Sequence, residues 1–233
     1  MNPRAKRFRN KVLASLPAAE LNRLSPHLVP IALPQHKSLL DGKATAAYFL
    51  EEGVASVVVT LQERETVEVG IIGNDGLVGI PTLLGVENGT SRTFMQIQGS
   101  GYSIKPNILR ENFEQPGELR RTLQKYVQAF MVQTAQTAAC NRVHGIEARL
   151  ARWLLACRDR MPSDQLHLTQ TFLGQMLGAP RTTVTLAVGI LERAGLIEHS
   201  RGVVIIRNRR ELEKMACECY RIVRDEYKSF RLL

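Results

Sequence analysis

The 233-residue sequence predicts an α+β fold in three consecutive parts: an antiparallel all-β domain, one long helix, and a small domain of short helices with a hairpin. Short β-branched runs alternate with turn residues between residues 29 and 105. After Pro116 and Gly117, a helical apolar period continues for about 27 residues without internal glycine or proline. Two short helical segments and a strand–turn–strand pattern come next. We place the domain boundaries at residues 1–115, 116–145 and 146–233.

The predicted all-β domain rests on two runs, VASVVVT at residues 54–60 and VEVGII at residues 67–72. Gly, Asn and Asp separate these runs from their neighbours, as expected for tight turns between short antiparallel strands. Short helical pieces divided by Pro17 precede them. The pattern indicates a sandwich or a barrel.

The long helix has apolar side chains at intervals of three or four residues. They are Leu119, Leu123, Tyr126 and Phe130, continued by Thr134 or Thr137. This seam has two possible partners: the β domain of the same chain, or a twin helix of a second subunit. Gly145 follows as the candidate hinge before the last domain.

Residues 169–194 carry the most informative pattern in the chain. Thr169 is placed to cap a first short helix, and Gly178 is placed to end it. Pro180 fits the first turn of a second helix. One face of that second helix is apolar and predicted to be buried, with Val184, Ala187, Val188, Leu191 and Ala194. Its other face has Arg181, Thr182 and Thr185 near the N-terminus, which suits a recognition helix in the DNA major groove.

A hairpin with its tip at Arg201 and Gly202 follows this second helix. A basic hairpin tip beside a recognition helix indicates a winged helix-turn-helix, whose wing contacts phosphate or the minor groove. Arg209 is a further candidate for phosphate contact. The predicted DNA-binding residues are Thr169, Gln170, Arg181, Thr182, Thr183, Thr185, Arg201 and Arg207.

The distribution of charge agrees with this assignment. Residues 148–233 hold 15 Lys and Arg against 9 Asp and Glu, whereas residues 28–147 hold 10 against 12. A basic end joined to a nearly neutral middle indicates that one part faces a polyanion. No apolar run is long enough for a membrane span or a secretory signal, so a cytoplasmic location with no membrane contact is expected. The sequence has no nucleophile–base or paired-carboxylate constellation, so no enzyme activity is expected.

The chain resembles the Crp/Fnr family of bacterial transcription regulators over nearly its whole length. The resemblance rests on the run YFLEEGVASVVV, on the long helix, and on L-G-x-x-L-G-x-x-R-T-T-V from Leu173 to Val184. It implies a jelly-roll-like β-roll of the cyclic-nucleotide-binding kind, dimerisation through the long helix, and a C-terminal winged helix-turn-helix. The implied partners are a double-stranded operator, a second copy of the chain, RNA polymerase and a small-molecule effector. No cofactor is expected, and the effector is not identified.

The recognition helix departs from the pattern that is frequent in the family, Arg-Glu-Thr-Val with a further Arg shortly after. Arg181 matches the first Arg, but Thr182 replaces the Glu and Leu186 stands at the later Arg. Arg181 keeps the capacity for a bidentate contact with guanine, while the acceptor for cytosine is missing. The half-site is therefore expected to differ from that of the cAMP-responsive members.

The effector region departs further. Family members that bind cyclic nucleotides have a Gly-Glu pair for the ribose and an Arg for the phosphate. Here Gly79 is followed by Ile80, Gly89 stands where the Arg is expected, and Arg92 is the nearest cation. The resemblance therefore gives Gly79, Ile80 and Arg92 as candidate pocket residues but argues against control by cAMP.

Other family sensors fit the sequence poorly. No Cys precedes Cys140, which argues against an N-terminal iron–sulfur cluster, and His27 and His36 have no supporting pattern for haem. Cys217 and Cys219, placed two apart on a helix, are expected to point about 200° apart, one buried and one partly exposed. No metal site is therefore predicted, and a redox role for this pair is left open. The alternative function is a ligand- or redox-sensing β-roll protein whose helix-turn-helix contacts protein.

Overall fold

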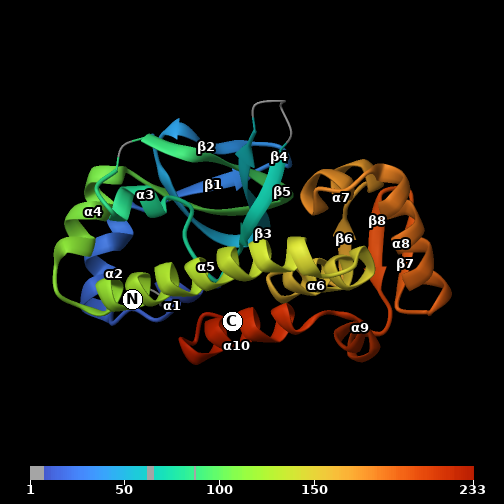
Figure 1. The fold of residues 1–233 in the computed structure, drawn as a ribbon. Coiled ribbons are helices and arrows are strands. Elements are labelled where there is room, and N and C mark those ends of the chain that lie inside the picture. Colours follow the sequence, from blue (N-terminus) through green and yellow to red (C-terminus); the bar gives the residue numbers. More distant parts are fainter. Residues whose placement is uncertain (1–7, 62–65, 87) are drawn as a thin grey trace.

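The computed structural model describes residues 8–61, 66–86 and 88–233 and confirms the α+β fold. A rolled antiparallel sheet lies over one long helix, and the helices and small hairpin of residues 146–215 lie at one end of that helix (Figure 1). None of the described helices combines the length and the apolar character needed to cross a membrane.

The N-terminal part is the predicted all-β domain, framed by short helices. The helical elements are α1 (Lys11–Ala14), α2 (Ala18–Leu24), the 3-10 turn η1 (Ser25–His27), α3 (Ile80–Leu83) and α4 (Pro106–Glu114). The strands are β1 (Val29–Leu33), β2 (Ser38–Lys43), β3 (Ala47–Thr60), β4 (Thr66–Ile72) and β5 (Asn88–Ile104).

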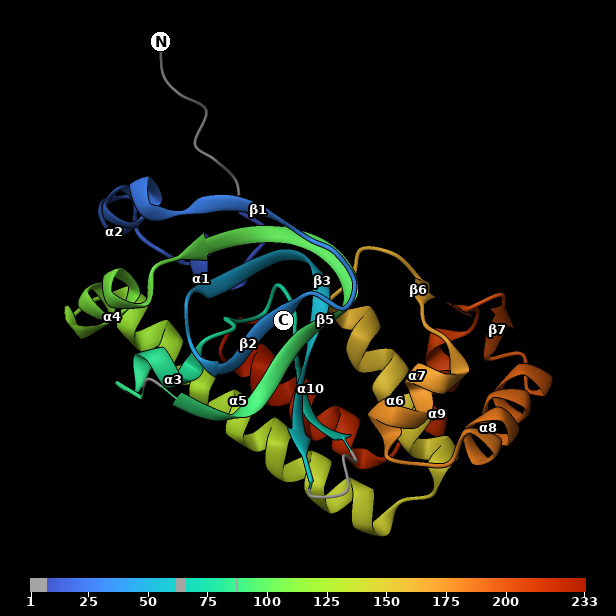
Figure 2. The ribbon, with the colours of Figure 1, turned by 90° about the horizontal axis from the view of Figure 1, so that it is seen from above.

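All strand pairs of this sheet are antiparallel, in the order β1-β5-β3-β4, with β2 also paired to β5. The register of β3 on β5 shifts between Leu50 and Ala55, and Gly53 lies within this bulge with φ +89°. A Cβ at Gly53 would lie 2.7 Å from the Ile97 carbonyl oxygen, so only glycine fits. Bulges of this kind bend a sheet, and the strands are visibly curved when seen from above (Figure 2).

The long helix α5 spans Glu118–Val143 and begins against α2. The Glu20 carboxylate accepts hydrogen bonds from the backbone N–H groups of Glu118 at 2.8 Å and Leu119 at 2.9 Å. It thus satisfies two N–H groups that the helix itself leaves without partners, where negative charge is also favoured. Gly117 permits this approach, because a Cβ there would lie 2.7 Å from a Glu20 oxygen.

The apolar seam of α5 packs on the β domain of its own chain. Leu119, Leu123 and Tyr126 are fully buried in a cluster with Phe49 and Leu77. The sequence left two partners open for this seam, and the structure shows that it packs on the β domain of the same chain. Any second subunit must therefore contact a different face of α5.

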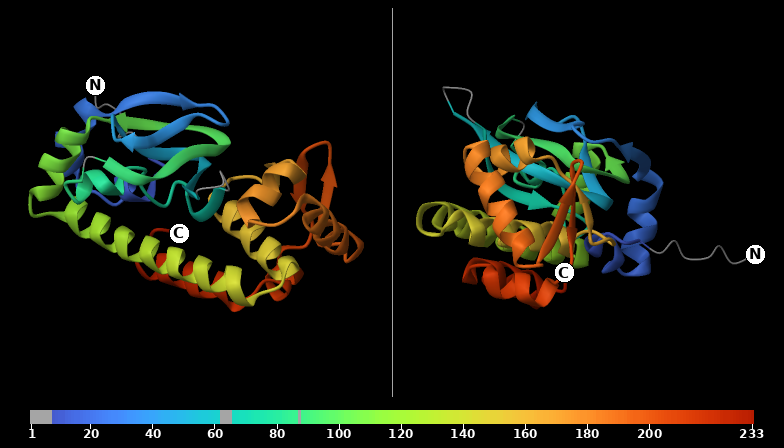
Figure 3. Two further views of the ribbon diagram at one scale, coloured as in Figure 1. Left: turned by 45° about the horizontal axis from the view of Figure 1, so that its top comes forward. Right: turned by 90° about the vertical axis from the view of Figure 1, so that its right-hand side faces the viewer.

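After the break at His144 and Gly145, the chain continues through seven elements into a terminal helix. These are α6 (Ile146–Asp159), β6 (Gln165–His167), α7 (Gln170–Leu177), α8 (Arg181–Arg193), β7 (Ile197–Ser200), β8 (Val203–Ile206), α9 (Arg209–Met215) and α10 (Glu218–Ser229). The helix α10 returns to lie along α5, as both views of Figure 3 show.

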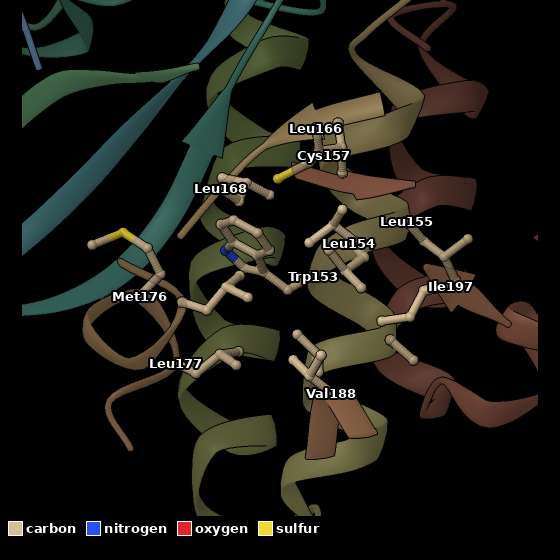
Figure 4. Packing of buried hydrophobic residues seen from close by; sticks show 14 of the residues in the cluster. Trp153, Leu154, Leu155, Cys157, Leu166, Leu168, Met176, Leu177, Val188 and Ile197 are labelled. Carbon is tan, nitrogen blue, oxygen red and sulfur yellow. The ribbon is translucent and has the colours of Figure 1, made fainter. Parts of the chain in front are cut away.

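One hydrophobic core contains residues of both the N-terminal sheet and the C-terminal helices. Trp153 of α6 lies at its centre, packed with Met176 and Leu177 of α7 and Val188 of α8 (Figure 4). The same cluster includes Val54 and Val58 of β3 together with Ile71 of β4 and Ile97 of β5. The C-terminal helices are therefore docked on the sheet through shared apolar contact.

Candidate nucleic-acid interface

The two short helices and the turn between them form as the sequence predicts. The Thr169 hydroxyl oxygen caps α7 by accepting a hydrogen bond from the Phe172 N–H at 3.2 Å. Gly178 ends α7 in the left-handed conformation, with φ 56° and ψ 46°. Pro180 precedes α8 at the N-cap position, one residue outside the first turn in which the sequence placed it.

The helix α8 has a buried apolar face and an exposed polar face. Val184, Ala187, Val188 and Leu191 are buried. Ala194 is exposed, so its predicted place in this stripe is wrong: α8 ends at Arg193, and Ala194 is the C-cap where the chain turns away.

The exposed face of α8 carries Arg181, Thr182 and Thr185, whereas Thr183 is half-buried. Leu186 lies on the same face with 69% of its surface exposed. An exposed leucine between polar side chains has no role in the core. It is a candidate contact residue that the sequence marked only as a departure from the family pattern.

A polar contact joins the leading ends of the two helices. The Thr185 hydroxyl lies 2.9 Å from Gln170 Oε1 and 2.9 Å from the Arg181 carbonyl oxygen. The structure thus brings together three of the predicted DNA-binding residues from α7 and α8.

The wing is a three-stranded sheet in the order β6-β8-β7, with a two-residue turn between β7 and β8. Arg201 has φ 46° and Gly202 has φ 80°, the pair of positive values that a type I′ hairpin turn requires. The Leu168 N–H donates to the Gly202 carbonyl oxygen at 2.8 Å. This bond holds the wing tip beside Thr169, at the start of α7.

The arginines of the predicted DNA-binding surface differ in their ion-pair partners. Within residues 8–61, 66–86 and 88–233, Arg181 and Arg201 have no ion-pair partner, and both are exposed. Arg207 is paired with Glu198. Arg209 bonds to Asp159 at 2.5 Å and to the Tyr220 hydroxyl at 2.8 Å, and its phosphate contact stays a prediction.

The predicted pocket residues do not meet in one cavity. Gly79 is buried with φ 127°, and Ile80 begins α3 and packs against the core beneath the sheet. Arg92 lies on β5 in an exposed ion pair with Asp41 at 3.3 Å. The hollow that Arg92 lines is formed with His36, Thr66, Phe94, Phe172, Gln175 and Met176, on the side of α7.

Protein side chains fill the space between the sheet and the first half of α5. The Tyr126 hydroxyl donates to the Leu77 carbonyl oxygen at 2.9 Å. Its ring lies so close to Gly76 that a Cβ there would come within 2.1 Å of a ring carbon. Burial raises the pKa of Tyr126, so this hydroxyl stays protonated.

The prediction that Cys217 and Cys219 point apart on one helix is wrong. Cys217 is the N-cap of α10 with extended backbone (φ −68°, ψ 164°), and only Cys219 lies in the first helical turn. Both thiols are buried. They lie together with Cys140 and His144 at the end of α5, and the ligand atoms of all four residues are within 4.8 Å of one another.

Comparison with known proteins finds a match for the C-terminal part of the chain. Residues 148–215 match the family model of the Crp-like helix-turn-helix domain. No curated protein sequence matches the chain.

More than four fifths of the chain is similar in fold to solved transcription regulators. A putative regulator of the Crp/Fnr family from Eubacterium rectale aligns with a TM-score of 0.65 at 14% identity, over 86% of this chain and 94% of that chain. FixK2 from Bradyrhizobium japonicum aligns with a TM-score of 0.69 at 14% identity, over 82% and 98%. The c-di-GMP-responsive global regulator CLP from Xanthomonas campestris aligns with a TM-score of 0.63 at 16% identity, over 82% and 99%.

These solved structures show the shared fold, and the domain match identifies the DNA-binding module within it. Residues 148–215 therefore match a Crp-like helix-turn-helix domain, and the chain has the fold of solved transcriptional regulators of the Crp/Fnr family.

Proposed function

We propose that the protein is a homodimeric regulator that binds a pseudo-palindromic operator, with α8 of each subunit in the major groove. The exposed face of α8 carries this proposal. Arg181 supplies a forked donor at the leading end of the helix, the geometry that suits guanine O6 and N7. Thr182 and Thr185 supply hydroxyl groups beside it.

Leu186 gives this face a further specificity. Apolar side chains in the major groove contact the methyl group of thymine, and Leu186 is the large apolar side chain exposed on α8. We therefore expect a half-site in which a guanine for Arg181 is followed by a thymine methyl within reach of Leu186. Arg201 at the wing tip is placed for phosphate contact, which adds affinity without sequence information.

A second stripe on α5 supports the homodimer. Gln124, Gln128, Met131, Ala135, Ala138 and Arg142 are exposed. Their spacing alternates between four and three residues, which is the period of a two-helix seam. Met131 is 62% exposed, and the alanines beside it would let a partner helix approach closely. Two such helices would place the recognition helices in successive major grooves, about one helical turn of DNA apart.

Independence from cAMP is the remaining part of the proposal. Ile80 offers no acceptor for a ribose hydroxyl and packs into the core instead. Arg92 is engaged by Asp41 and lies in a hollow that neither Gly79 nor Ile80 lines. These placements separate Arg92 from Gly79 and Ile80, so the candidate cation and the candidate ribose site do not lie together. RNA polymerase and a small-molecule effector remain predicted partners of the regulator.

Selection of bound duplexes from a random library by the full-length protein tests the proposal. We expect a pseudo-palindromic motif whose half-sites are about one helical turn apart, with the same motif and affinity when cAMP is added. Recovery of no motif, of a single asymmetric half-site, or of a motif only with cAMP would contradict it.

A further inference from the structure

We propose that Cys140, His144, Cys217 and Cys219 form a tetrahedral site for one Zn²⁺ ion at the junction of α5, the hinge and α10. No part of the regulator's proposed function uses these residues. The site would tie the end of the long helix to the C-terminal helix, next to the point where the DNA-binding domain begins.

The distances between the ligand atoms fit a single ion. The four atoms lie within 4.8 Å of one another, with Cys140 Sγ 3.5 Å from Cys217 Sγ and Cys219 Sγ 3.7 Å from His144 Nδ1. Ligands about 2.3 Å from a tetrahedral Zn²⁺ are about 3.7 Å apart. The thiolates of a four-iron cluster are held much farther apart, because the cluster itself stands between them.

Local backbone geometry explains how the four residues converge. Cys140 and His144 are four residues apart at the end of α5, and the His144 N–H still bonds to the Cys140 carbonyl oxygen at 3.1 Å. Their side chains therefore share one face of the last turn. Cys217 is extended and Cys219 is helical, which brings both thiols to the N-terminal end of α10.

A neighbouring carboxylate orients the imidazole. His144 Nε2 lies 3.3 Å from the Glu218 carboxylate, and His144 Nδ1 faces Cys219. A hydrogen bond from Nε2–H to Glu218 leaves the Nδ1 lone pair free for a metal. Carboxylate partners of this kind fix the tautomer of most metal-binding histidines.

Cations of α6 offset the negative charge of the ligands. Three thiolates and one Zn²⁺ carry a net charge of −1, and Arg149 and Arg152 act electrostatically on Cys140. Positive charge beside the cluster stabilises thiolate, the form of cysteine that binds metal.

The composition of the site selects the type of metal and its role. Three thiolates and one imidazole are the soft donor set of structural zinc sites. All four positions come from the protein, so no open position is left for a substrate. The ion would therefore act as a cross-link between the hinge and α10.

Metal analysis of the full-length protein, purified without chelator from zinc-containing medium, tests the proposal. We expect about one Zn²⁺ per chain. Replacement with Co²⁺ should give the intense visible bands of tetrahedral cobalt with thiolate charge transfer, and Zn²⁺ should displace it. This spectrum needs no variant, so the test does not depend on the folding of any mutant.

Matched variants locate the site. Cys219→Ser and His144→Ala should each lower zinc retention and weaken the cobalt spectrum. Cys157→Ala is the control, because Cys157 is buried in a different core, next to Gln96. It should keep one Zn²⁺ per chain.

Three results would overturn the proposal: no tetrahedral cobalt spectrum, iron with acid-labile sulfide in place of zinc, or a Cys140–Cys217 disulfide. The disulfide would show as a loss of two hydrogen atoms from the intact mass without bound metal. None of these measurements uses DNA, so failure here is distinct from failure of the regulator's proposed function.

Discussion

The Glu68 carboxylate on β4 accepts a hydrogen bond of 2.6 Å from the indole Nε1–H of Trp153 on α6. Ser56 donates a second hydrogen bond to the same carboxylate. Burial raises the pKa of Glu68 to about 7, against a lowering effect of both bonds and of Arg152. The contact between the sheet and the DNA-binding domain therefore includes a carboxyl group that titrates near neutral pH.

Replacing Glu68 should flatten the pH dependence of stability. Between pH 4.5 and about 7 the native state keeps a proton that the unfolded chain releases, so the free energy of unfolding falls as pH rises. Glu68→Gln removes this loss, which is at most about 3 kcal/mol. Urea unfolding at pH 5 and pH 8 measures it, with Glu111→Gln at an exposed position as control. Equal changes with pH in the parent and Glu68→Gln would refute this role.

A buried ion pair is a second contact between the N-terminal domain and the DNA-binding domain. Arg160, which follows α6, lies 2.5 Å from Asp75, and both side chains are almost fully buried. Asp75→Asn keeps an oxygen for the bond from the Gly73 N–H but leaves the charge of Arg160 without its partner. We expect a loss of about 3 to 5 kcal/mol in the free energy of unfolding.

The exposed pair of Asp41 and Arg92 supplies the control for this change. Asp41→Asn should cost less than about 1 kcal/mol, because solvent screens that pair. A similar cost for both variants in denaturant titrations would show that burial does not strengthen the Asp75 contact.

Local patterns predicted the helix-turn-helix well, because its signals are close in sequence. The cap at Thr169, the left-handed Gly178 and the turn at Arg201 and Gly202 each depend on a few adjacent residues. The seam of α5 could not be assigned to one partner, since the same apolar period suits the sheet or a second helix. Its contact with Phe49 and Leu77 depends on the tertiary fold.

The cysteine cluster could not be predicted from local sequence patterns. Cys140 and Cys217 are 77 residues apart, and no pattern in either segment indicates that they meet. The expected divergence of Cys217 and Cys219 assumed one continuous helix, whereas α10 begins between them, at Glu218. The assumption that both cysteines lie within the helix thus concealed the proposed set of metal ligands.

The wing should contribute affinity without specificity. Arg201→Ala should weaken binding about equally on all duplexes and lower the salt slope by about 1, because one phosphate contact is lost. Arg207→Ala is the matched control, since Arg207 is already paired with Glu198 and should change the slope less. Fluorescence anisotropy across a salt series measures both, and a greater effect at Arg207 would reverse the assignment.

The exposed stripe of α5 should hold the dimer. Ala135→Glu places a charge in the middle of the proposed seam, so we expect light scattering to report a monomer. Lys125→Glu, exposed on α5 outside this stripe, should remain a dimer. A dimer that survives Ala135→Glu, together with unchanged operator affinity, would place the interface elsewhere.

The most direct test of DNA recognition by α8 compares the sites selected by the parent and by Arg181→Ala from one random duplex library. Arg181 is exposed at the leading end of α8, so its removal should cost about 1 to 3 kcal/mol and relax base preference at one position per half-site. The remaining positions should keep their preference. An identical motif from both proteins would contradict the role of Arg181 and the recognition surface built around it.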